Sequence, residues 1–160
     1  MDIEAKLADL GIVLPPAPEP PPGFQFAFEW VRVHGTRVYA SGHSAQLPDG
    51  SFAGPFGKVP SEVGIDAACD AAKLTALSML GNIQRAIGDL DRITAWLTVS
   101  GMVNADSGFP QSTVVINGFS DFVTQLFGPV VGGHARTAVG LAALPLNNAV
   151  VVSAELEIAP

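Results

Sequence analysis

The sequence predicts one α+β domain, a β-sheet that carries two helices on one face. Two observations predict it. Segments with strand-like and helix-like periodicity alternate in the order ββαβαββ, and the 160-residue length suits a single hydrophobic core. Hydrophobic residues make up 48% of the chain and charged residues only 14%, which excludes a disordered chain. We therefore expect residues 23–160 to form the domain and residues 1–22 to precede it as a separate N-terminal segment.

The N-terminal segment combines a short helix with a proline-rich arm. Residues 2–10 place Ile3, Leu7 and Leu10 at helical spacing behind Asp2, a good capping residue, so a short docking helix is expected. Six of the eight residues in 15–22 are proline. Such a stretch favours an extended polyproline II arm that crosses a surface without forming a core of its own.

Four strands are predicted outside the centre of the domain. Aromatic and β-branched residues on either side of a His-Gly-Thr turn predict a hairpin, and a glycine- and proline-rich loop follows it at residues 42–63. A Leu-Pro-Leu-Asn-Asn turn joins the last two strands. The four expected strands are residues 24–33, 37–41, 135–141 and 149–158.

The centre of the domain should contain two helices and one strand. Residues 65–87 carry an apolar stripe that ends before Gly88, and residues 117–127 carry a second one that Gly128-Pro129 closes. Residues 93–100 alternate as a strand does. The alternation assigns Ile93, Ala95, Leu97 and Val99 to the core and Trp96 to the opposite face.

Nothing in the chain is predicted to cover the second face of the sheet. Trp96 and Val151 make that face partly apolar, and association with copies of the same chain would bury it. We therefore expect an obligate oligomer.

Charge and composition exclude several classes of partner. The net charge is −7, from 15 acidic against 8 basic residues, and no basic run is present, so nucleic acid is not an expected partner. Uninterrupted apolar runs such as 149–152 are far shorter than the ~20 residues of a membrane span, and the acidic N-terminus is unlike a signal peptide. A cytoplasmic protein without membrane contact is expected. The single cysteine, Cys69, is interpreted as a core residue and not a nucleophile.

Four motifs, in order and spacing over residues 23–158, resemble the Rid (YjgF/YER057c/UK114) family. The similarity is greatest to the longer branch labelled endoribonuclease L-PSP or chorismate-mutase-like. The motifs are Ser41-Gly-His43, Ala86-Ile-Gly-Asp-Leu-Asp-Arg-Ile93, Asn117-Gly-Phe-Ser-Asp121 and His134-Ala-Arg-Thr-Ala-Val-Gly-Leu-Ala-Ala-Leu-Pro145.

The resemblance implies a chorismate-mutase-like fold in which three protomers pack their sheets into a barrel, with clefts at the interfaces. Archetypal members hydrolyse reactive enamines and imines to 2-keto acids and ammonia, whereas other members lack this activity. No cofactor and no metal are implied. The expected partners are two further copies of the chain, forming a homotrimer, and a small carboxylate-bearing molecule.

Arg136 is the strongest candidate for a ligand-binding residue. It lies among small apolar residues of a predicted strand, where a guanidinium is costly unless it meets a partner or a polar cleft. The structural alternative is an ion pair with Glu155 or Glu157. Because Arg136 also falls on the family's substrate-carboxylate arginine, and a guanidinium binds a carboxylate with two parallel hydrogen bonds, we favour the ligand interpretation.

Two residues compete for the catalytic position on the last strand. Ser153 and Glu155 share one face of that strand, while Val152 and Ala154 point to the other. The family's water-activating glutamate falls on Ser153 when the strand is aligned by its end, and on Glu155 when the preceding turn absorbs two residues. Serine cannot act alone as a base near neutral pH.

Five further residues are candidates for ligand contacts through the resemblance. Asn117 matches the family's asparagine, with helix capping as the alternative, and Phe28 stands where the archetype has a tyrosine. Ser41 ends a strand near the expected cleft. His43 and His134 flank motifs of the cleft and are each able to change charge near neutral pH, although hydrogen-bonded structural roles are the alternative.

Three functions fit these residues. The first is a hydrolase of the enamine or imine deaminase type. The second is a non-catalytic small-molecule binding module in which Arg136 holds a carboxylate. The third is a specialised biosynthetic enzyme that acts on an unstable intermediate in the same pocket. The acidic balance disfavours the ribonuclease activity in the family's older label.

Overall fold

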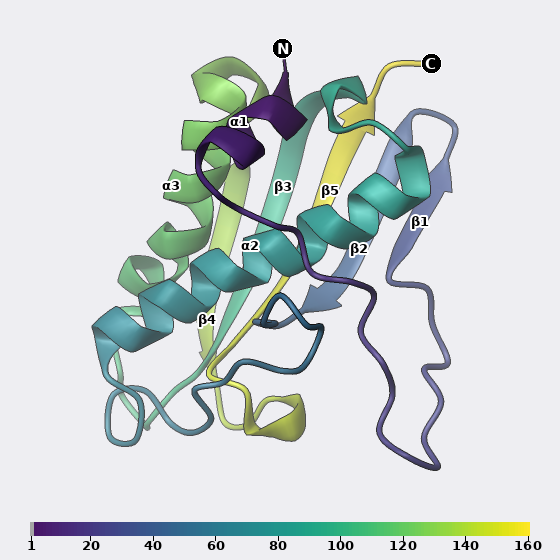
Figure 1. The fold of residues 1–160 in the computed structure, drawn as a ribbon. Coiled ribbons are helices and arrows are strands. Elements are labelled where there is room, and N and C mark those ends of the chain that lie inside the picture. Colours follow the sequence, from purple (N-terminus) through teal and green to yellow (C-terminus); the bar gives the residue numbers. More distant parts are fainter. Residues whose placement is uncertain (1) are drawn as a thin grey trace.

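A computed structural model describes residues 2–160 and contains one five-stranded mixed sheet (Figure 1). The strands lie in the order β1-β2-β5-β3-β4, so β1 and β4 form the two edges. Only the pair β3 and β4 is parallel. The strands are β1 (Val31–His34), β2 (Arg37–His43), β3 (Ile93–Asn104), β4 (Ala135–Leu141) and β5 (Val150–Ile158).

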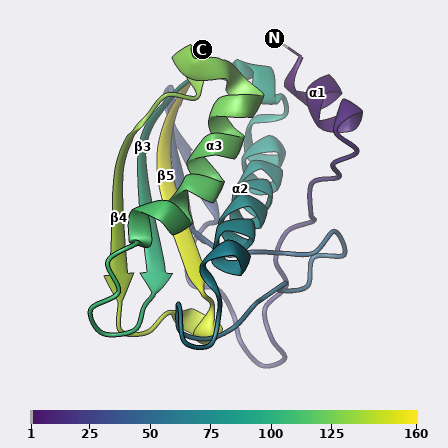
Figure 2. The same ribbon diagram turned by 90° about the vertical axis from the view of Figure 1, so that its left-hand side faces the viewer.

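Two long helices, α2 (Ile65–Ile87) and α3 (Ser112–Val131), pack on the same face of the sheet (Figure 2). Within the described residues, no helix covers the opposite face. The predicted α+β class, the order ββαβαββ and the one-sided packing of the helices are therefore confirmed. Short 3₁₀ turns at Leu90–Arg92 and Pro145–Asn147 complete the domain.

The apolar stripe predicted for α2 forms the centre of the core. Its members are spaced so that they lie on one side of the helix, and all of them are buried. Gly88, at φ 85°, ends the helix at the predicted residue. The stripe consists of Ala68, Ala72, Ala76, Met79, Leu80, Ile83 and Ile87.

Helix α3 begins five residues earlier than predicted, at Ser112, but its regular part ends where expected. Gly128 has φ 78°, which interrupts the helical backbone before Pro129. A β-carbon on Gly118 would lie 2.1 Å from the carbonyl oxygen of Cys69 in α2. Glycine at this position therefore allows the backbones of α2 and α3 to touch.

By length and composition α3 would also be able to cross a membrane. Its apolar side, which includes Phe119, Val123 and Phe127, is buried against the sheet and α2. This packing explains why one side of the segment is apolar.

The alternation predicted for β3 is wrong in its middle, because the ladder between β3 and β5 shifts register twice, between Ile93 and Ala95 and between Trp96 and Thr98. The shifts turn Trp96 to the helix side, where it is 2% exposed and contacts the rings of Phe119 and Phe127. Ala95 is only half-buried.

Leu97, which was expected in the core, is half-buried as well. Further along β3 the original alternation resumes, with Val99 and Val103 buried under α3. The open face of the sheet is still partly apolar without Trp96. It exposes Tyr39, Val139 and Leu141 and half-exposes Val151.

The first predicted strand is much shorter than residues 24–33. Only Val31–His34 pairs with β2, around a turn in which Gly35 has φ 60°. Residues 24–30 have aromatic side chains suited to a strand, but the ladder of β1 begins only at Val31. They form an aromatic segment without regular secondary structure at the end of the proline arm.

The N-terminal helix α1 (Ile3–Asp9) docks on the domain as predicted, and Asp2 caps it by accepting from the backbone N–H of Ala5 at 2.9 Å. Ile3 and Leu7 are buried in the main core. The helix lies beside α3 and the turn before β3 (Figure 1).

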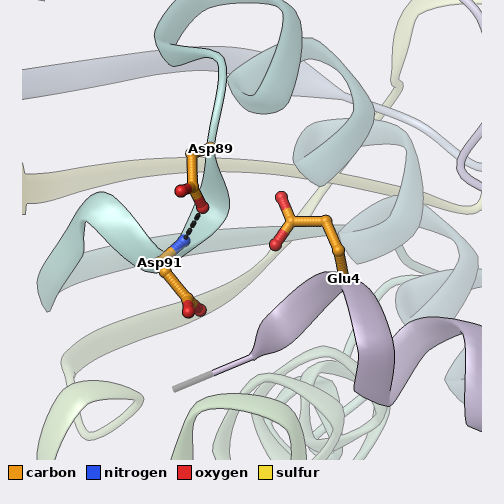
Figure 3. A group of neighbouring side chains, drawn as sticks. All are labelled: Glu4, Asp89 and Asp91. Atoms are coloured by element: carbon orange, nitrogen blue, oxygen red, sulfur yellow. Dashed lines mark hydrogen bonds between the residues drawn. The ribbon is translucent and has the colours of Figure 1, made fainter.

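Three carboxylates, Glu4, Asp89 and Asp91, gather where α1 meets this turn (Figure 3). Each accepts a backbone N–H: Glu4 from Leu90 at 2.9 Å, Asp89 from Asp91 at 2.8 Å, and Asp91 from Ile3 at 3.0 Å. The acids therefore accept hydrogen bonds from backbone N–H groups at the start of α1 and in the turn, and fix the helix to the domain.

Candidate functional site

Arg136 lies on the edge strand β4 and points to the α3 side of the sheet. Its Nη1 donates to Ser120 Oγ at 3.0 Å, and its Nη2 donates to the backbone carbonyl oxygen of Thr113 at 3.3 Å. The side chain is half-buried. Both acceptors are neutral, so these contacts orient the guanidinium without balancing its charge.

A histidine completes this group. Ser120 Oγ and His134 Nε2 are 2.8 Å apart, and His134 Nδ1 is 2.7 Å from the carbonyl oxygen of Gly132. Because the carbonyl only accepts, Nδ1 carries the proton, and Nε2 accepts from the serine hydroxyl. Arg136, Ser120 and His134 thus form one hydrogen-bonded chain.

Asn117 also belongs to the α3 face that Arg136 meets. It stands four residues after Thr113 and three before Ser120, a spacing that places all three on one side of the helix. The alternative interpretation of Asn117 as a helix cap is wrong, because α3 begins at Ser112. Asn117 itself is half-buried.

The ion-pair alternative for Arg136 finds no support in residues 2–160, where its side-chain bonds go to Ser120 and Thr113. Arg136 lies opposite Val99 of β3, whose side chain is under the helices. Glu155 and Glu157 point to the other face of β5, away from buried Ala154 and Leu156. The guanidinium and the two acids therefore lie on opposite faces of the sheet.

Ser153 and Glu155 line a small hollow of about 150 Å³ on the open face. Tyr39 of β2 and Ser100 of β3 contribute to its walls, and Ser100 pairs directly with Ser153 in the ladder. The predicted shared face of Ser153 and Glu155 is confirmed by the burial of Val152 and Ala154. The hollow offers hydroxyl groups and one exposed carboxylate.

Ser41 fastens the aromatic segment to β2. Its Oγ donates to the carbonyl oxygen of Glu29 at 2.7 Å, and its backbone N–H donates to Trp30 O at 3.0 Å. The register of β2 against β5 is irregular between Ala40 and His43, which breaks the strand's alternation at Ser41.

His43 is fully buried, so it is not positioned as a surface ligand group within the chain. Its Nδ1 donates to the carbonyl oxygen of Ser41 at 2.6 Å, and its Nε2 accepts from Asn82 at 3.0 Å. Burial lowers the pKa of His43 to about 4, assisted by the charge of Arg85 and opposed by the bond to Ser41. The expectation that His43 changes charge near neutral pH is therefore wrong.

Phe28 lies at the opposite edge of the sheet from Arg136. It belongs to the aromatic segment before β1, is 50% exposed, and packs edge-on against Trp30 at 5.0 Å between ring centroids. Both rings line an apolar cavity of about 440 Å³. Within a single chain, Phe28 and Arg136 do not meet.

Cys69 is half-buried at the α2–α3 contact, and not fully in the core as expected. Its Sγ lies 3.4 Å from the carbonyl oxygen of Val114. Partial burial raises the pKa of the Cys69 thiol, and the nearby Asp66, Asp70 and Asp121 add to this effect. A neutral thiol agrees with its interpretation as a structural residue.

Three groups of this site escaped sequence analysis. Ser120 lies within a quoted motif, but nothing in its spacing shows that it bridges two residues on other elements. Asn82 and Arg85 lie on the α2 turns that face His43, and a polar pair near the end of an apolar stripe was the only signal for them.

The fold and the polar group at the edge of its sheet define a class, the chorismate-mutase-like α+β proteins. No family model matches the chain. Protein TCP17 of Trypanosoma cruzi is 35% identical over 157 residues, which are 98% of this chain and 94% of that protein. The alignment therefore includes nearly all of the N-terminal arm, beyond the stretch in which the resemblance was seen.

Solved structures with the same fold support this relationship. The protein Atu1372 of Agrobacterium tumefaciens, of unknown function, is 32% identical with a TM-score of 0.84, over 98% of this chain and 91% of that one. A candidate endoribonuclease of Shewanella oneidensis has a TM-score of 0.87 at 23% identity, over 99% and 100% of the two chains. TdcF of E. coli, solved with bound serine, shares the fold at 16% identity and a TM-score of 0.59, over 91% and 94%. The chain belongs to the Rid (YjgF/YER057c/UK114) family.

Proposed function

We propose that this protein binds a small carboxylate-bearing molecule through Arg136, in a cleft between the subunits of a homotrimer, and hydrolyses an enamine or imine there. The guanidinium of Arg136 carries this proposal. It is half-buried, its two side-chain hydrogen bonds go to neutral oxygens, and three of its five N–H donors remain for a ligand. A partly desolvated cation with fixed orientation favours an anion that accepts two parallel bonds.

The need for a second subunit follows from the placement of the groups. Arg136 lies on the helix side of an edge strand, whereas Ser153 and Glu155 lie on the open face of a central strand. A ligand that touches both sets must bind between two copies of the chain. The exposed apolar side chains on the open face, Tyr39 and Val139 among them, give such copies a surface to bury.

The chemistry requires a base near the reacting carbon, and Glu155 is the carboxylate in the open-face hollow. In the proposed reaction Glu155 accepts a proton from a water molecule, whose oxygen attacks the imine carbon. The resulting carbinolamine loses ammonia as the proton passes to nitrogen, which leaves a keto compound. Ser153, in the same hollow, is placed to hydrogen-bond the attacking water.

One structural neighbour was solved with a small amino acid. TdcF was solved with serine, a small molecule that carries a carboxylate and an amino group. At this identity the likeness establishes the fold alone, so the argument for a carboxylate in this chain depends on Arg136.

The test is the release of 2-keto acid from freshly generated imino acids, measured against the uncatalysed background. Arg136→Ala should weaken carboxylate binding by about 1.5–3 kcal/mol, the scale of hydrogen bonds to charged groups, and Arg136→Lys should rescue only part of the loss. Arg32→Ala, which removes an exposed strand arginine, is the matched control. Unfolding of Arg136→Ala would show that the arginine is structural.

Two further measurements separate the parts of the proposal. Light scattering in dilute buffer should give about three times the monomer mass, and a stable monomer would contradict the inter-subunit cleft. Glu155→Gln should abolish turnover and retain binding, because the amide keeps the shape but removes the proton acceptor. A wild-type protein that binds ligand without turnover, and gains turnover in Ser153→Glu, would instead be a binding module or a specialised biosynthetic enzyme.

A further inference from the structure

The aromatic segment after the proline arm is held in a fixed place although it has no regular secondary structure. At the start of the proline arm that precedes it, Arg85 Nη1 donates to the carbonyl oxygen of Pro15 at 3.0 Å. At the end of the segment, Ser41 binds the carbonyls of Glu29 and Trp30. Figure 1 shows the arm and this segment together leaving α1, crossing α2 and returning to β1. One anchor at the start of the arm and one at the end of the segment hold this stretch of chain on the domain.

The surface of this segment is a cluster of four aromatic rings, those of Phe24, Phe26, Phe28 and Trp30. The backbone bends within this segment, and Phe26 contacts each of the other three rings. Neighbouring rings contact one another with centroids 4.9–5.7 Å apart. Phe24 is nevertheless 58% exposed. Large rings left open to solvent in a concave arrangement are typical of a binding surface.

The four aromatic rings form one wall of the cavity of about 440 Å³, a size usual for small-molecule sites. The opposite wall is made by Gly42 of β2, Val151 of β5 and Leu146 of the turn before β5. No charged side chain lines the cavity, and Ser44 and Asn148 are its polar members. The cavity is therefore suited to an apolar group and not to a carboxylate.

The cavity lies next to the open-face hollow along the same two strands. On β5, Val151 lines the cavity, and Ser153 and Glu155 line the hollow, all on one face of the strand. On β2, Gly42 lines the cavity and Ala40 lines the hollow. Two residues along a strand span about 7 Å, so an apolar compartment lies directly beside a polar one.

We propose that this cavity holds the apolar side chain of the ligand, and that the substrate class is a carboxylic acid derivative with an aromatic or branched aliphatic side chain. The inference rests on the proposed function, which places the reacting carbon at Ser153 and Glu155. An aryl group in the cavity would contact the faces and edges of Phe28 and Trp30.

The test compares three probes by calorimetric titration: phenylpyruvate, pyruvate and the uncharged benzyl alcohol. The wild-type protein should bind phenylpyruvate roughly 10- to 100-fold more tightly than pyruvate, the effect of burying one ring. Phe28→Ala should lower this ratio severalfold. Phe56→Ala is the matched control, because Phe56 is 48% exposed and lies outside the cavity. Arg136→Ala should weaken both keto acids and keep their ratio.

The possible failures are distinguishable. Equal binding of the two keto acids, lost in Arg136→Ala, overturns the side-chain inference and leaves the carboxylate site intact. Binding of benzyl alcohol alone, reduced by Phe28→Ala, overturns the proposed function and leaves an apolar site. If no probe binds and Phe28→Ala lowers the mass of the assembly, the cavity is filled by a neighbouring copy, and the inference is wrong.

Discussion

Replacing the buried histidine His43 should change how the stability of the protein depends on pH. His43 is fully buried, donates to Ser41 O and accepts from Asn82. A proton on Nε2 would face the amide N–H of Asn82. The amide cannot turn over without loss, because its oxygen accepts from Arg85 at 2.7 Å. Geometry and burial thus both favour the neutral ring.

The magnitude follows from the pKa of His43, which folding lowers from 6.5 to about 4. Because the unfolded chain binds the proton more readily, stability is fully present above the unfolded pKa and is lost as pH falls from about 6.5 towards 4. This lowering of the pKa corresponds to roughly 3 kcal/mol of stability carried by the neutral ring. About 2 kcal/mol of this should be lost by about pH 5.

Urea unfolding at several pH values and one protein concentration measures this effect. His43→Gln lowers stability at every pH, but its curve should fall less steeply than that of the wild type between about pH 7 and pH 5. His34→Gln, which removes an exposed histidine of β1, controls for the substitution. Parallel curves for the wild type and His43→Gln would refute the assignment of a buried, neutral ring.

Two further predictions concern the packing that positions the site. Gly118→Ala should destabilise the fold by about 1–3 kcal/mol or more, because its β-carbon would meet the backbone of Cys69, whereas Gly64→Ala has open space and should cost little. Equal unfolding free energies would contradict the close helix contact. Glu4→Ala should cost about 1–3 kcal/mol in a urea titration, since the buried N–H of Leu90 loses its acceptor, while Glu4→Gln keeps an oxygen there. An equal loss in both variants would show that the charge of Glu4, and not its hydrogen bond, fixes α1.

The sequence was sufficient where a pattern repeats over many residues. The stripe of α2 and the strand β4 were predicted to the residue, because packing against one layer imposes a period on each. The alternation along β3 failed at Trp96, since a register shift between two strands leaves no mark in either sequence. The predicted strand over residues 24–30 is absent for a related reason. Strand propensity does not say whether a partner strand is present.

Among the candidate site residues, too, local sequence context was readable and tertiary contacts were not. Arg136 was identified because a guanidinium among apolar strand residues is costly to bury unless it meets a polar partner or a cleft. Its partner Ser120 was not assigned, because the contact joins a helix and a strand 16 residues apart. The environment of His43 depends on Asn82, 39 residues away, and its low pKa arises from burial that no motif reports. Single residues suggest chemistry, and tertiary contacts decide their charge and direction.

The network around His43 also explains how an arm without secondary structure holds its position. Arg85 binds Pro15 at the start of the arm and, through Nη2, the amide oxygen of Asn82. Asn82 binds His43, and His43 binds the carbonyl of Ser41, whose own N–H and hydroxyl hold the end of the aromatic segment. One chain of hydrogen bonds, with Asn82 and His43 buried at its centre, therefore joins the start of the proline arm to the end of the aromatic segment through α2. Of these bonds, the one from Asn82 to Nε2 needs the neutral form of His43, so the uncharged ring that stabilises the fold also keeps this link between the proline arm and the aromatic segment.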